Sequence, residues 1–305
     1  MSAFGALRSR FGPTRHVKAG SRRFARTGFA ETTLAEIAWQ RTRGAVGRWA
    51  IAGAVIGALL AFVAFAPAAW LAHSVSAATG ERLLLTDARG SVWAGSALPV
   101  LTGGPGSRDA TALPGRLEWR LGWAGFGLEL RVRQACCLRG ELRARLTPGL
   151  GRFKVTLLPS DSSTVGQWPA AWLAGLGTPW NTLQLGGTLR LTSSGLAVEW
   201  VQGRVRFTGD AALDVSQASS RLSTLDTLGS YRLTLHGDAA SGDAATLQLL
   251  TLDGALRLSG AGQWTDNGVR FRGEAQAAEG SETVLANLLN IIGRRQGARS
   301  VISIG

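Results

Sequence analysis

Apolar and polar residues alternate along most of the chain after residue 80. Two clear examples are Leu117-Glu-Trp-Arg-Leu121 and Leu128-Glu-Leu-Arg-Val-Arg133. Such alternation places one row of side chains on a core and the other row in water, as in a β-strand of an antiparallel sheet. The same pattern predicts further strands over residues 138–146, 153–157, 183–191, 197–201, 204–208, 231–235 and 269–272.

Turn-forming residues separate these stretches. They include Ser193-Ser194-Gly195, Thr208-Gly209-Asp210 and Gly237-Asp238. Asp266-Asn267-Gly268 predicts a tight hairpin, because Asn-Gly favours the turns that join antiparallel strands. Strands joined by short turns, with no long helices between them, predict a mainly β fold built as an antiparallel meander. The pattern fits an open curved sheet and a sandwich equally well.

Two stretches have a helical pattern. Residues 169–176 predict a short helix between strands. Residues 281–292 predict a C-terminal helix with one apolar face formed by Val284, Leu285, Leu288, Leu289 and Ile292. Ser281 is expected to cap this helix and Gly293 to end it. Residues 300–304 predict a last strand.

The longest apolar stretch lies near the N-terminus, and no charged side chain occurs between Trp49 and Gly80. About 20 apolar residues suffice to cross a bilayer, and tryptophan favours its interfaces. We therefore expect a transmembrane helix over residues 49–72, with Trp49 and Trp70 near its ends and Leu59, Leu60, Phe62 and Phe65 within it. A cleaved signal ending at Ser76-Ala77-Ala78 is the alternative. The apolar run is longer than the usual signal core of about 7–15 residues, which favours the anchor.

The charge distribution bears on topology. The 305 residues have a net charge of +13, which for a whole protein would suggest nucleic acid or an anionic membrane. Residues 1–48 contain ten basic and two acidic side chains, whereas the other 257 contain 23 and 18. Positive charge beside an apolar span marks the cytoplasmic side. We thus expect a disordered cytoplasmic tail over 1–48, a domain across the membrane over 73–305, and no nucleic-acid partner.

The sequence contains few groups of residues that are suited to catalysis or metal binding. The three histidines, His16, His73 and His236, are too far apart in sequence to form a local metal motif. Neither a nucleophile elbow, a zinc-protease motif nor a phosphate-binding loop occurs. The sequence therefore predicts a non-enzymatic protein without catalytic, cofactor-binding or metal-binding residues.

Cys136 and Cys137 are the only cysteines and fall in a predicted strand. Neighbouring strand residues point to opposite faces, and a bond between them would strain the ladder. Structural thiols are therefore favoured over a vicinal disulfide or an intermolecular bridge.

Tryptophan is abundant in the predicted β body, where most indoles would fill a core. Trp168, Trp172 and Trp180 lie together in a connection rich in glycine and proline. We consider these three the candidate partner surface, because exposed tryptophans are common at binding sites.

Several segments resemble one family in their order along the chain. They are the span ending Ala66-Pro-Ala-Ala-Trp-Leu-Ala72, then Ala88-Arg-Gly-Ser-Val-Trp-Ala-Gly-Ser-Ala97, and residues 173–183, 221–231 and 285–300. Together, over about residues 45–305, they resemble the type II secretion system protein N family. The basic extension of about forty residues departs from the compact start of that family.

The resemblance implies a non-catalytic, single-pass inner-membrane subunit of the Gram-negative machine that exports folded periplasmic proteins. Its partners would be other secretion subunits, and most of the chain would be periplasmic. By this interpretation the β body is a scaffold that offers edge strands or tryptophans to partners. The alternative is a membrane-anchored periplasmic module that binds or transfers lipid, by analogy with other open β-sheets.

Overall fold

The computed structural model describes residues 48–158, 163–238, 244–265 and 268–305. The described residues fall into two units, which divide between residues 61 and 62. Described residues 48–64 are helical, so the boundary between the units falls within this helix. The predicted tail over 1–48 lies outside the described residues except for Arg48.

The single helix expected over 49–72 is interrupted. Helix 48–64 ends before Pro67, and a second helix, α2, covers Ala68–Ala78. Proline has no backbone N–H and clashes with the preceding turn, so an unbroken helix through Pro67 is disfavoured. No helix of the described ranges is both long enough and apolar enough to cross a membrane.

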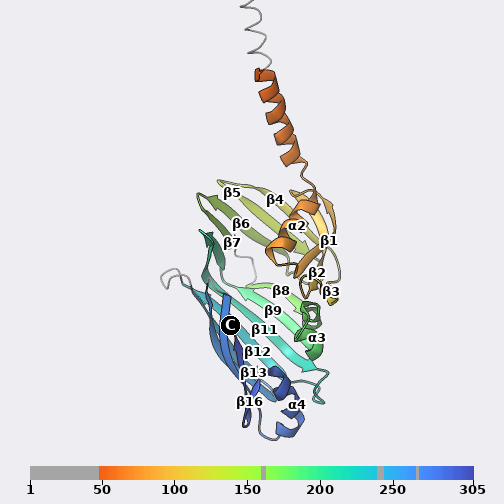
Figure 1. The fold of residues 1–305 in the computed structure, drawn as a ribbon, viewed down its shortest axis with the longest axis vertical. Helices are drawn as coiled ribbons and strands as arrows, with labels where there is room; N and C mark the ends of the chain where they lie inside the picture. The colour runs from red at the N-terminus through yellow and green to blue at the C-terminus, as the bar shows by residue number, and fades with distance from the viewer. Residues whose placement is uncertain (1–47, 159–162, 239–243, 266–267) are drawn as a thin grey trace, which may run out of the picture. The chain divides into compact units, whose positions relative to one another are not determined.

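The rest of the chain is a mainly β structure (Figure 1). The first strands are β1 (Leu83–Gly90), β2 (Ala94–Thr102), β3 (Ala110–Ala112), β4 (Leu117–Ala124), β5 (Gly127–Gln134), β6 (Glu141–Gly149) and β7 (Arg152–Leu157). They are followed by β8 (Thr164–Pro169), a 3-10 helix η1 (Ala170–Leu176) and a short helix α3 (Trp180–Leu183).

The C-terminal part continues the meander. Its strands are β9 (Leu185–Ser193), β10 (Ala197–Val201), β11 (Arg204–Ser220), β12 (Gly229–Gly237), β13 (Ala245–Asp253), β14 (Leu256–Thr265) and β15 (Gly268–Ala277). Helix α4 (Glu282–Ile292) and the strands β16 (Arg294–Gln296) and β17 (Arg299–Ile304) complete the chain.

All strand pairs are antiparallel, and together they form one sheet of 17 strands. The pairs run β1–β2–β4–β5–β6–β7–β10–β11–β12–β13–β14–β15–β17–β16. β3 lies beside β2, and β8 pairs with β9, which pairs with β11. The predicted antiparallel meander is confirmed, and the sheet is open, with β1 and β16 at the two ends of this order.

Most predicted strands are confirmed, but three details were wrong. Leu138 forms an isolated bridge with Gly166 and residues 139–140 form a bend before β6, whereas residues 183–184 belong to the end of α3 and its cap. Gly209 does not make a turn, because it lies within β11, where that strand passes from pairing with β10 to pairing with β9. Its φ is +92°, and a Cβ there would lie 2.5 Å from the Gly195 carbonyl oxygen. Glycine thus lets one long strand serve two partners. Asn267 of the predicted hairpin lies outside the described residues, although β14 and β15 do pair.

The strand register places nearly all large apolar side chains on one face of the sheet. In β14 and β15, Leu256, Leu258 and Trp264 pair with Ala277, Ala275 and Val269. The alternate positions pair polar or charged residues, such as Arg257 with Gln276. The same alternation holds across β4–β13, so the sheet has one apolar face and one polar face.

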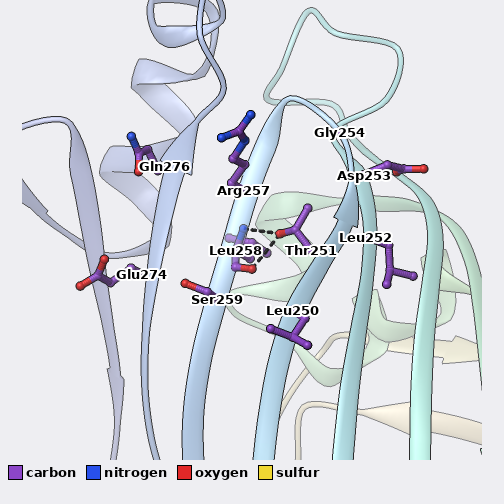
Figure 2. A pocket seen from close by; sticks show the side chains of 10 residues that line it. All are labelled: Leu250, Thr251, Leu252, Asp253, Gly254, Arg257, Leu258, Ser259, Glu274 and Gln276. Carbon is purple, nitrogen blue, oxygen red and sulfur yellow. Dashed lines mark hydrogen bonds between the residues drawn. The ribbon is translucent and has the colours of Figure 1, made fainter.

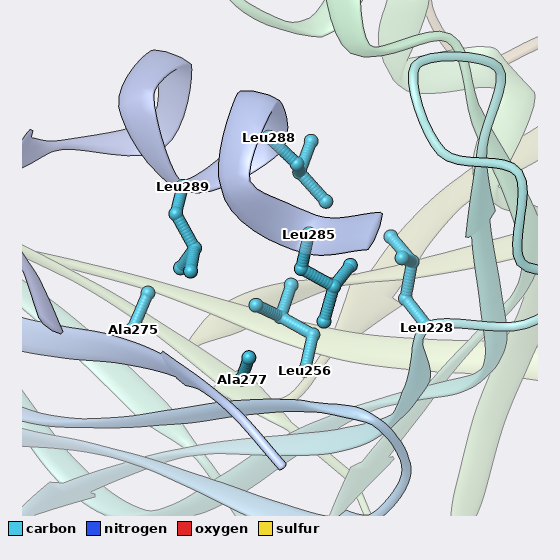
Figure 3. Packing of buried hydrophobic residues seen from close by; sticks show 7 residues of the cluster. All are labelled: Leu228, Leu256, Ala275, Ala277, Leu285, Leu288 and Leu289. Carbon is cyan, nitrogen blue, oxygen red and sulfur yellow. The ribbon is translucent and has the colours of Figure 1, made fainter. Parts of the chain in front are cut away.

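Helix α4 covers part of the apolar face at the C-terminal end of the sheet (Figure 3). Its buried leucines, Leu285, Leu288 and Leu289, pack against Leu228, Leu256, Ala275 and Ala277. The C-terminal helix is confirmed, and so is its apolar face at Leu285, Leu288, Leu289 and Ile292, whereas Val284 is exposed. Ser281 precedes it but makes no side-chain capping hydrogen bond, so that expectation was wrong. At the other end, the buried Ser300 hydroxyl donates to the Leu289 carbonyl over 2.6 Å.

A second cluster lies at the other end of the sheet. Here Ala68 of α2 packs with Ala97, Trp119 and Val132 of three strands. The Trp119 indole donates to the Val92 carbonyl over 3.1 Å. The apolar face is thus covered by α2 near one end of the sheet and by α4 near the other.

Candidate interaction surfaces

The three tryptophans predicted to face a partner are each half-buried. Trp168 lies in β8, where it pairs with Leu189. Trp172, in η1, donates its indole N–H to the Thr111 carbonyl over 3.0 Å and so ties η1 to β3. Trp180 begins α3. The structure therefore gives Trp172 an internal role, and the use of this segment by a partner stays a prediction.

A depression of about 740 Å³ lies beside this segment. It is lined from η1, α3, β3 and the end of β11. Within it the Asn181 side chain donates to the Asp109 carboxylate over 2.9 Å. Its lining is mixed polar and apolar, and no nucleophile–base pair is arranged among these residues.

The most exposed large apolar residues of the sheet are elsewhere. Trp123 is 79% exposed, and Phe126 and Leu150 are fully exposed. Trp123 ends β4, Phe126 lies in the β4–β5 turn, and Leu150 lies in the β6–β7 turn. Sequence reasoning missed this group. The available signal was an apolar residue next to a turn glycine, in Gly125-Phe126 and Leu150-Gly151, where polar residues usually occur.

The residues expected to face a membrane are exposed apolar side chains. Trp49, Leu59, Leu60, Phe62 and Phe65 all have this character in or next to helix 48–64. Trp70 lies beyond the break at Pro67, in α2, and its ring centroid is 4.6 Å from that of Phe62. It therefore folds back on Phe62 instead of extending the same helix.

On the polar face, a depression of about 500 Å³ lies over β13, β14 and β15 (Figure 2). The Thr251 hydroxyl donates to the Leu258 carbonyl and accepts from the Leu258 N–H, next to the last paired residues of β13 and β14, Leu250 and Ser259. The side chains of Arg257 and Glu274 stand apart on neighbouring strands (Figure 2). The lining has no pair of groups arranged for acid–base or nucleophilic chemistry.

The two cysteines form a vicinal disulfide, so the preference for free thiols was wrong. The expectation assumed a strand, but Cys136 and Cys137 lie in the turn between β5 and β6. A turn does not impose the alternation that sets neighbouring strand side chains on opposite faces. The Cys137 carbonyl accepts from the Gln167 N–H over 2.7 Å, which joins this turn to β8.

Exposed ion pairs lie along the polar face of the sheet and near strand β1. The Asp210 carboxylate contacts the His236 ring and raises the pKa of that histidine. The Arg116 guanidinium, with a contribution from Arg89, lowers the pKa of Asp87. Within the described ranges, no three His, Cys, Asp or Glu side chains come together as a metal site would require.

The comparisons with known proteins give one assignment. The family model of the type II secretion system (T2SS), protein N, matches residues 81–302, from just before β1 to within β17. No curated protein and no solved structure matches the chain. Because the match covers well over half of the chain, the protein belongs to the type II secretion system protein N family.

Proposed function

We propose that this protein is a non-catalytic inner-membrane scaffold of the type II secretion system, with its β domain in the periplasm. Membership of the family makes it a component of that system and implies contact with the other components. The match over residues 81–302 is the observation that carries the proposal.

The anchor is the apolar helix. The 17 described helical residues, 48–64, extend about 25 Å at about 1.5 Å per residue, close to the ~30 Å of a hydrocarbon core. Their large apolar side chains are exposed, which is unfavourable in water and favourable in lipid. The basic residues of 1–48 then favour a cytoplasmic N-terminus.

The scaffold role is supported by the sheet edges. β1 forms hydrogen-bonded pairs with β2 along one side. An edge strand presents backbone N–H and C=O groups to which a strand of another protein can add. At the opposite edge, β16 is only three residues long and exposes Arg294 and Arg295, a composition that discourages strand addition. We therefore favour β1 as the edge for partner contact.

A deletion strain tests the secretion role. Without the gene, secreted proteins should accumulate in the periplasm, and the full chain should restore export. A photo-crosslinking residue at exposed Thr86 of β1 should capture a secretion subunit, whereas one at Arg295 of β16 should not. Unchanged export in the deletion strain, together with no captured subunit, would reject the scaffold proposal.

Lipid binding along the apolar face is a second candidate function. Between the parts covered by α2 and α4, apolar side chains of β11–β13 are only half-buried, among them Leu213, Leu233, Leu235, Leu247 and Leu249. A paired sheet interior offers no free backbone hydrogen bonds, so an acyl chain fits this face better than an extended peptide. Native mass spectrometry of the full chain should then detect bound phospholipid. Replacement of Leu233 and Leu249 by Asp should abolish it.

A further inference from the structure

Three neighbouring hairpins end on the same side of the sheet. Their turns are Gly125-Phe126 between β4 and β5, Leu150-Gly151 between β6 and β7, and Gln202-Gly203 between β10 and β11. β5 pairs with β6 and β7 pairs with β10, so the three turns form one row. We call this row the tip surface.

Large apolar side chains gather on the tip surface. Two of its turns present a fully exposed Phe126 and Leu150. Just below the turns lie Trp123, Phe153 and Trp200, all exposed, and the rings of the last two are 6.0 Å apart. Two-residue hairpin turns favour Gly, Asn and Asp, so exposed Phe and Leu there are not explained by turn formation.

The positive charge of the domain is concentrated in the same strands. Residues 117–157, which comprise β4–β7, contain eight basic and three acidic side chains. The other residues of 49–305 contain fifteen of each sign, so β4–β7 account for the whole excess. Arg145, Arg152 and Lys154 lie on the polar face near the turns. Of the acidic residues there, Glu129 is already paired with Arg131 at 2.8 Å.

The tip surface is also connected to the end of the apolar helix. Within the larger unit, the Trp93 indole donates to the Val63 carbonyl over 2.8 Å. The rings of Trp93 and Trp123 stack with their centroids 6.4 Å apart. Trp123, at the β4–β5 tip, is therefore one side chain away from Trp93, which contacts Val63 near the C-terminal end of helix 48–64.

We propose that the tip surface docks on the membrane, with Phe126 and Leu150 inserted among the lipids and Arg145, Arg152 and Lys154 on anionic phospholipid headgroups. Exposed apolar side chains flanked by basic residues are suited to the interface of an anionic bilayer. The inference rests on the anchor of the proposed function, which brings the β domain to a bilayer. Docking would hold the β domain against the membrane and leave the β1 edge in a fixed orientation for partners.

The test uses the full chain in vesicles of phosphatidylcholine, with or without phosphatidylglycerol. With the native cysteines replaced by serine, a fluorophore is attached at Phe126→Cys or, as the matched control, at Leu252→Cys, an exposed leucine next to the β13–β14 turn. In anionic vesicles the label at 126 should be quenched by brominated acyl chains and shielded from aqueous iodide. The label at 252 should show the reverse.

A charge variant tests headgroup recognition. Arg152→Gln with Lys154→Gln should lower the ratio of docked to free tips about thirtyfold, because each basic residue near an anionic surface contributes about 1 kcal/mol. Arg221→Gln with Arg257→Gln, on residues far from the tips, should leave the ratio unchanged.

Equal iodide access at 126 and 252 would overturn the inference, and equal docking without phosphatidylglycerol would overturn its anionic part. A chain that resists alkaline extraction yet has an aqueous label at 126 would reject docking alone. Release by alkaline extraction would reject the anchor of the proposed function instead.

Discussion

The packing of α4 on the sheet gives the sharpest stability prediction. Leu285 is 0% exposed and lies between Leu228, Leu256 and the alanines of β15 (Figure 3). Leu285→Ala removes three carbon atoms from this contact. Loss of their burial, plus the cavity left behind, should cost about 3 kcal/mol. Because α4 contacts the sheet through one layer of leucines, most of this cost should appear as easier opening of the helix.

Native-state hydrogen exchange of the full chain measures that opening. A loss of about 3 kcal/mol raises the opening constant of α4 about 150-fold, and the protection of its amides should fall accordingly. Val284→Ala is the matched control on the same helix, since Val284 is 37% exposed and should change stability by less than about 0.5 kcal/mol. If both variants reduced protection equally, α4 would not be held by its buried leucines, and the core assignment would be refuted.

Three further predictions concern single side chains. Ser300→Ala should destabilise the protein by about 1 kcal/mol in urea unfolding, because the buried Leu289 carbonyl loses its hydroxyl donor. Ser303→Ala, at an exposed serine, should have no effect, and equal effects of the two substitutions would contradict this reasoning. Asp210 raises the pKa of His236, so this pair stabilises the fold at pH values below the ordinary histidine pKa. The contribution is lost as the pH rises through the raised pKa of His236. An NMR titration of His236 should show a lower midpoint in Asp210→Asn than in the unchanged protein. The adjacent cysteines should take up no alkylating reagent in the folded, unreduced protein and two equivalents after reduction. Intact-mass measurement would show this uptake. Uptake without reduction would contradict the vicinal disulfide.

Much of the fold follows from local pattern. Alternation located β4, β5, β7 and β10, and the apolar stripe of residues 281–292 located α4, because both depend on neighbours close in the chain. Strands such as β2 (Ala94–Thr102) and β8 (Thr164–Pro169) were missed, since glycine, proline and bulges obscure their alternation. The β8 register, for example, shifts between Thr164 and Gly166.

The candidate surfaces were harder to find from sequence. Trp168, Trp172 and Trp180 were chosen because they are close in the chain, but exposure depends on what packs over a side chain. The Trp172 indole donates a hydrogen bond to the carbonyl of Thr111, which lies 61 residues away in sequence. The tip surface, by contrast, joins turns about 25 and 50 residues apart that become neighbours only through the pairing of β5 with β6 and of β7 with β10.

The sequence by itself determined the secondary-structure class, the apolar N-terminal helix and the family, since periodicity, composition and motif order are properties of the chain alone. Only the tertiary structure decided that the meander forms one open sheet with a single apolar face, because closure depends on which distant strands share hydrogen bonds. The same holds for the vicinal disulfide, which depends on a turn, and for the concentration of exposed aromatic and basic side chains at one row of hairpins.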